Sequence, residues 1–140
     1  MAPMKDCCCG VDVHKSFIVA VIAKLNDKDV IFTGYKRFST FKKGLLEFKA
    51  WLGMHDCYEI CMESTGKYYI PVYRTIADET FHVDVVHPKY VKAPRGKKND
   101  KKDAKRIADM YMRDHIAEYS IIPTAEILAI RDVTRYRRKT

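Results

Sequence analysis

The order of strands and helices that the sequence predicts is what most constrains the fold. Three runs rich in β-branched and aromatic residues follow one another at 7–16, 17–25 and 30–39. NDKD, a turn signal, joins the second run to the third. Such short links suit an antiparallel meander of three strands, because parallel strands need a much longer crossover.

Helices and strands are expected to alternate in the next part of the chain. Ser39 or Thr40 can cap a helix that ends near Gly53 and carries apolar residues at helical spacing. Residues 56–64 and 81–88 have the composition of a fourth and a fifth strand.

Three further helices complete the expected order. One opens at Ser64 or Thr65 and must hold Pro71 near its first turn. The next begins near Asn99, and the last begins near Pro123 and reaches the end of the chain. The order β-β-β-α-β-α-β-α, with a C-terminal helix, is that of an α/β ribonuclease H-like fold with a mixed five-stranded sheet.

Length and cysteine content narrow the class of protein. The chain has 140 residues, which suits one domain. No apolar run approaches the ~18 residues of a membrane span, and the N-terminus does not resemble a signal peptide. We therefore expect a cytoplasmic protein whose five cysteines are reduced, and mostly small buried residues: Cys7, Cys8, Cys9, Cys57 and Cys61.

The charge favours a nucleic acid as partner. The formal net charge is +8 and the pI is about 9.2. Residues 89–106 hold nine Lys or Arg against two Asp. We expect phosphate contacts from this segment, through Lys92, Arg95, Lys97, Lys98, Lys101, Lys102, Lys105 and Arg106.

Four acidic residues fall where the expected fold brings elements together. Asp12 lies in the first strand, and His14 on the same face could contact a phosphate. Glu63 ends the fourth strand, while Asp100 and Asp103 share one face in the first turn of a helix. Taken singly, each acid also has a structural explanation, since acids favour helix N-termini.

Together the four acids point to metal chemistry. In the expected fold the first and fourth strands are neighbours and the helix packs across them, so four carboxylates would meet. Like charges at one place need a cation between them. Two Mg²⁺ or Mn²⁺ ions about 3.5–4 Å apart would meet that need and act on a phosphodiester.

Four ordered motifs carry a family resemblance. GVDVHK at 10–15, MESTG at 62–66, HP at 87–88 and KNDKKDA at 98–104 resemble the DEDD transposases. These are bacterial insertion-sequence recombinases related to Piv-type invertases, with a RuvC-like N-terminal domain. The resemblance implies metal-dependent DNA cleavage and strand transfer, with Asp12, Glu63, Asp100 and Asp103 as the catalytic and metal-binding residues. It also implies a homo-oligomer and a structured RNA that selects the DNA target.

The sequence departs from the family in two respects. Asn99 stands where a threonine often precedes the third acid. The family also carries a C-terminal domain with a serine implicated in strand exchange, which this chain does not contain. We therefore expect residues 1–122 to be the catalytic domain and 123–140 to begin a helix that links it to the missing domain. Such a piece would at most nick DNA slowly and would not complete recombination.

Three other functions stay open on sequence grounds. A stand-alone ribonuclease H-like nuclease or junction resolvase would need no second domain. A half of an actin-like ATPase would need glycine-rich phosphate loops, which the sequence lacks. A non-catalytic nucleic-acid-binding module would use the acids only as caps and ion pairs, and metal binding would separate it from the nucleases.

Overall fold

The computed structural model describes residues 5–64, 66–88, 100–113 and 119–121. The described elements are β1 (Cys7–Val13), β2 (Phe17–Asn26), β3 (Asp29–Ser39), α1 (Lys42–Met54), β4 (Glu59–Ser64), α2 (Tyr69–Ile76), β5 (His82–Pro88), α3 (Asp100–Met112) and β6 (Tyr119–Ile121). The basic segment at 89–98, the expected last helix and the expected linker at 123–140 lie outside the described residues.

One mixed sheet forms the centre of the molecule, with strand order β3-β2-β1-β4-β5-β6. The first three strands are antiparallel, and β4 and β5 continue the sheet parallel to β1. The meander and the adjacency of the first and fourth strands are thus confirmed. The sixth strand, antiparallel to β5, was not predicted, because three residues are too short to give a periodic signal.

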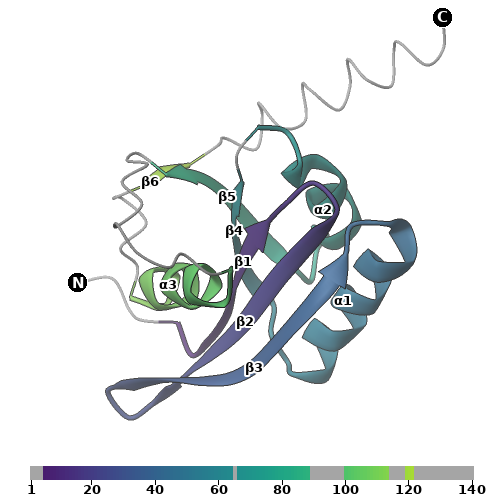
Figure 1. The fold of residues 1–140 in the computed structure, drawn as a ribbon. Coiled ribbons are helices and arrows are strands. Elements are labelled where there is room, and N and C mark those ends of the chain that lie inside the picture. Colours follow the sequence, from purple (N-terminus) through teal and green to yellow (C-terminus); the bar gives the residue numbers. More distant parts are fainter. Residues whose placement is uncertain (1–4, 65, 89–99, 114–118, 122–140) are drawn as a thin grey trace, which may run out of the picture.

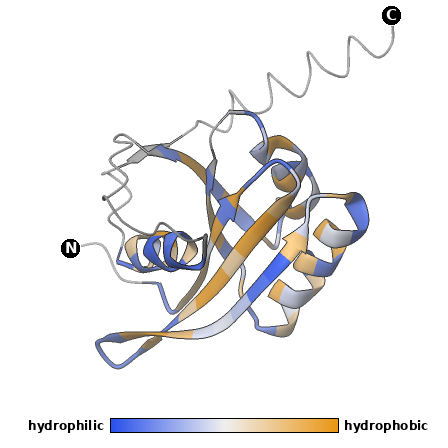
Figure 2. Ribbon diagram, in the orientation of Figure 1, coloured by the Kyte–Doolittle hydropathy of each residue, from blue (hydrophilic) through white to orange (hydrophobic). Residues whose placement is uncertain are grey.

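The helices cover both faces of the sheet (Figure 1). On one face α1 and α2 pack through Phe48, Leu52, Val72 and Ile76. On the other face α3 packs along β1 and β2. The hydropathy colouring agrees with this, since β2 is hydrophobic along most of its length (Figure 2). A strand buried on both faces carries apolar residues at successive positions rather than alternate ones.

Strand β1 divides its side chains as the sequence predicts. Cys9, Val11 and Val13 enter the core beneath α1 and α2. The intervening positions, among them Gly10, face α3. A Cβ atom at Gly10 would lie 2.4 Å from both the carbonyl oxygen of Ala104 and the amide nitrogen of Ala108. The backbone of α3 therefore lies directly on β1, which only glycine allows.

Two expected helix starts were wrong, that of α1 by one or two residues and that of α2 by about four. Helix α1 begins at Lys42 after Phe41, and the hydroxyl of Ser39 accepts a hydrogen bond from the amide of Phe41 without capping the helix. Helix α2 begins at Tyr69 rather than at 64 or 65, because Gly66 takes a positive φ of 67° that interrupts a helix. Pro71 accordingly falls in the first turn.

The cysteines behave largely as small core residues. Cys8, Cys9, Cys57 and Cys61 are buried, Cys7 is half-buried, and all five are free thiols. Burial raises the pKa of the Cys8 thiol to about 12. The part of the chain that the structure describes contains no helix long and apolar enough to cross a membrane.

Candidate active site

Two buried carboxylates lie side by side on adjacent strands at the centre of the sheet. Strands β1 and β4 are parallel, and their register pairs Asp12 directly with Glu63. Both lie near the carboxyl ends of their strands, and only 9% of Asp12 and 8% of Glu63 is exposed. They are the buried charged residues among those that the structure describes. Burial of two neighbouring acids is unfavourable unless cations or donors accompany them.

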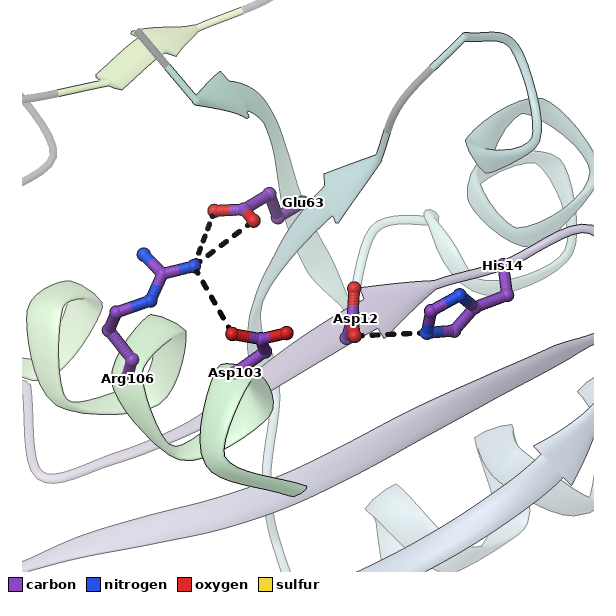
Figure 3. Close-up of polar contacts among 5 residues, drawn as sticks. All are labelled: Asp12, His14, Glu63, Asp103 and Arg106. Atoms are coloured by element: carbon purple, nitrogen blue, oxygen red, sulfur yellow. Dashed lines mark hydrogen bonds and ion pairs between the residues drawn. The ribbon is translucent and has the colours of Figure 1, made fainter. Parts of the chain in front are cut away.

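Helix α3 brings a third carboxylate and a guanidinium to these acids. Arg106 donates from Nη2 to both oxygens of Glu63, at 3.1 and 3.2 Å. The same nitrogen lies 4.0 Å from Oδ1 of Asp103, three residues earlier on the helix. Figure 3 shows the guanidinium between the two carboxylates. The close contact of α3 with Gly10 fixes the distance of the Asp103 and Arg106 side chains from the sheet.

A histidine accompanies the remaining acid. His14 Nε2 lies 2.9 Å from Oδ2 of Asp12, and the imidazole ring stacks on Phe17 with ring centroids 4.4 Å apart. His14 follows directly after β1, and its amide donates to the carbonyl of Phe17 in the turn to β2. The ring is thereby held against Asp12 from the edge of the site (Figure 3).

The donor set suits a hard divalent cation. Carboxylate oxygens are the ligands that Mg²⁺ and Mn²⁺ take in proteins. Among the described residues, however, no three His, Cys, Asp or Glu side chains are grouped closely enough to hold a metal ion. Arg106 lies between Glu63 and Asp103 instead. A metal would fit these carboxylates only after the guanidinium, half of which is exposed, has moved away.

The structure locates some of the other predicted residues. Asp100 is the first residue of α3, and its side chain lies outside the described part of the chain. The same holds for Lys92, Arg95, Lys97 and Lys98. Lys102 is exposed on α3.

The three other basic residues predicted to bind phosphate divide between the two flanks of α3. Lys101 and Lys105 lie on the flank next to β3, over the aromatic rings of that strand. Arg106 lies on the opposite flank, at Glu63. The contact of Arg106 with the acids was not predicted from the sequence. The spacing of three residues between Asp103 and Arg106 could have indicated it, because residues three apart on a helix are neighbours.

Two solved structures illustrate the likeness of fold. A resolvase of Fowlpox virus, solved with its Holliday junction substrate, has a TM-score of 0.58 and 11% identity, covering 76% of this chain and 98% of that one. RuvC of Thermus thermophilus has a TM-score of 0.58 and 10% identity, covering 83% and 99%. At such identities the likeness shows the fold alone, which is the expected ribonuclease H-like, RuvC-like one.

The sequence comparison identifies the family. No curated protein sequence matches the chain. The model of the IS110-type DEDD transposases, described as a transposase, matches residues 9–140. This span contains the whole described sheet from Cys9 onwards and all four predicted acids. With a RuvC-like fold and paired acids at the centre of the sheet, the chain belongs to the DEDD transposase family of DNA-cleaving enzymes.

Proposed function

We propose that Asp12, Glu63, Asp100 and Asp103 hold Mg²⁺ or Mn²⁺ and that the chain cleaves DNA strands there. One observation carries the proposal, the direct pairing of buried Asp12 with buried Glu63 on parallel strands. Two ionised carboxylates in such a position repel each other, and a nearby cation offsets this repulsion. Bound metal would supply activation of an attacking water and stabilisation of the leaving oxygen.

The chain's own residues prepare the site for this chemistry. The sheet holds Asp12 and Glu63 at a fixed separation, since both belong to paired strands. His14 holds one oxygen of Asp12, and so orients this carboxylate at the end of its strand. Arg106 neutralises Glu63 and Asp103 while no divalent cation is bound.

Arg106 then has a second use. Its guanidinium is half exposed, and when it leaves Glu63 it can donate two parallel hydrogen bonds to a phosphate. We infer that Arg106 exchanges a carboxylate for the DNA backbone when metal and substrate bind. This use agrees with its prediction as a phosphate-binding residue.

Plasmid nicking tests the proposal. Supercoiled plasmid is incubated with the protein in Mg²⁺, in Mn²⁺ or in EDTA, beside a four-way junction and a linear duplex. We expect slow nicking with either metal, none in EDTA, and none with Asp12→Asn or Glu63→Gln. Glu79→Gln is the matched control, because Glu79 is an exposed acid outside the site.

Calorimetry with Mn²⁺ separates the competing functions. Metal binding that is lost in Asp12→Asn supports the nuclease, whereas nucleic-acid binding with no metal binding would make the chain a non-catalytic module. Preference for the four-way junction would favour a resolvase. The RNA partner, the homo-oligomer and the boundary at 122 remain predictions, which sequencing of co-purified RNA, mass photometry and limited proteolysis would test.

A further inference from the structure

An open groove lies along the flank of α3 that faces away from Glu63. Its volume is about 270 Å³, and its lining includes Phe32, Gly34 and Tyr35 of β3 with Lys101 and Lys105 of α3. β3 is an edge strand of the sheet, so the groove opens to solvent. None of these residues belongs to the carboxylate site.

A β-bulge gives the groove its aromatic wall. Residues three apart on a regular strand point to opposite faces of a sheet. The register of β2 with β3 shifts between Ile22 and Ala23, so Phe32 pairs with Ala23 and Tyr35 with Val21. Ala23 and Val21 both face α3, and the bulge therefore puts Phe32 and Tyr35 on that face together.

These two aromatic side chains are exposed, unlike their apolar neighbours on the α3 face of the meander. Half of Tyr35 and 41% of Phe32 is accessible to solvent, whereas most other apolar side chains on the α3 face of the meander are buried. The lysine ammonium groups are held close to them, with Lys101 Nζ 4.7 Å from the ring centre of Tyr35 and Lys105 Nζ 4.8 Å from that of Phe32.

A third cation extends the row along the same edge. Arg37 pairs with Val19, which also faces α3, and its guanidinium lies 3.7 Å above the ring of Phe17. Aromatic rings interleaved with cations, on a chain of net charge +8, complement a ligand with flat faces and a regular row of negative charges.

We propose that this groove binds an unpaired DNA strand, with Lys101, Lys105 and Arg37 at the phosphates and Tyr35 and Phe32 against the bases. The proposal rests on the proposed function, because it supplies the strand on which the carboxylates act. Duplex DNA does not fit this chemistry, since its base faces are stacked on each other and only its phosphates are available. The two sites are separated by the width of one helix, about 10 Å, which a few nucleotides can span.

Binding by fluorescence anisotropy tests the proposal. The ligand is a fluorescein-labelled strand of twenty thymidines, and the protein is the full chain with Asp12→Asn in EDTA, so that neither metal nor cleavage contributes. We expect Tyr35→Ala and Phe32→Ala each to weaken binding about tenfold, within the range measured for loss of a stacking ring. Tyr35→Leu, which keeps apolar bulk and removes the flat face, should weaken binding similarly.

Ile31→Ala is the matched control. Ile31 precedes Phe32, has the same 41% exposure and points to the opposite face of β3. It should change the dissociation constant less than twofold. Lys101→Ala and Lys105→Ala should each reduce the log–log dependence of affinity on salt by about 0.7, the value for one phosphate of a single strand.

Four results would overturn the proposal. The first is that the aromatic variants bind the thymidine strand as tightly as Ile31→Ala does. The second and third are that the aromatic variants lose as much affinity for duplex DNA as for the single strand, or lose affinity only for an RNA strand of the same length. The fourth is that the protein self-associates and that Tyr35→Ala abolishes this self-association. Because the assay contains no metal, such a result leaves the nuclease proposal intact. Conversely, failure of the nicking assay would not alter this binding result.

Discussion

Replacing Gly10 by alanine tests how closely α3 must approach β1 for the carboxylate site to form. The added Cβ would lie 2.4 Å from two backbone atoms of α3, at Ala104 and Ala108, and 2.9 Å from a third. Ordinary contact of a Cβ begins at 3.4 Å. The obstructing atoms are backbone, so no side chain can rotate away, and the helix must retreat by the difference of about 1 Å.

The retreat has a cost in stability and a larger cost in activity. Overpacking of this kind destabilises a core by about 1–3 kcal/mol, which lowers Tm by roughly 5–10 °C in a domain of this size. The contact from Arg106 to Glu63 would lengthen from 3.1 Å to about 4 Å, beyond hydrogen-bond range. Asp103, which we propose as a metal ligand, moves with the same helix, and a displacement of about 1 Å in a catalytic group can slow a reaction ~10²-fold.

The assay is thermal unfolding followed by plasmid nicking at a temperature where both proteins are folded. Gly53→Ala in α1 is the control, because a Cβ there meets nothing within 4 Å. It should stabilise the protein by about 0.5–1 kcal/mol, the usual gain for alanine over glycine in a helix. A Gly10→Ala protein with the Tm and nicking rate of the unmodified chain would refute the reasoning.

Three further perturbations follow from contacts in the structure. Arg106→Ala removes the cation beside Glu63. Because the guanidinium is half exposed, we expect the free energy of unfolding without metal to fall by only about 1 kcal/mol, and calorimetry to show severalfold tighter Mn²⁺ binding. Weaker Mn²⁺ binding would show that Arg106 does not compete with the metal. A hydrogen bond with the Cys57 thiol lowers the pKa of Cys7 to about 7. Iodoacetamide should therefore label Cys7 increasingly as the pH rises through 7, which mass spectrometry would measure. Cys57→Ala should slow this labelling at neutral pH. The hydrogen bond from Lys49 lowers the pKa of Asp78 to about 2. Because the folded pKa lies below that of an unfolded aspartate, the contribution of this carboxylate to stability is present above about pH 4 and is lost towards pH 2. The Tm difference between the unmodified chain and Asp78→Asn should therefore be present at pH 6 and vanish near pH 2; a constant difference would contradict the assignment.

The sequence predicts the sheet because its patterns are unambiguous where burial is complete. The alternation around Asp12 in β1 and the β-branched composition of the apolar run in β2 both favour strands. In the fold that this element order favours, the first and fourth strands are neighbours, which brings Asp12 near Glu63; their direct pairing is set by the register of the two strands.

The rest depends on contacts that no local pattern encodes. Arg106 stands in a lysine-rich run, and only the docking of α3 reveals that its guanidinium lies against Glu63. The bulge at β3 has no sequence signal of its own, yet it decides which way Phe32 and Tyr35 point. For this reason the nearness of Asp12 to Glu63 could be predicted from sequence and the groove could not.

The elements that carry the carboxylates, β1, β4 and α3, lie far apart along the chain, and this affects the order in which they assemble during folding. The β1–β2–β3 meander is built from local pairings, whereas the thiol of Cys8 donates to the carbonyl of Ala108, 100 residues further on. Contacts that close long loops form late. We expect pulsed hydrogen exchange to protect the amides of β2 before those of β1 that pair with β4, and simultaneous protection would contradict this order. During synthesis, β1 and β4 leave the ribosome before α3. If the proposed site needs Asp103 of α3, the nascent chain cannot cleave nearby DNA until this helix has docked on the sheet.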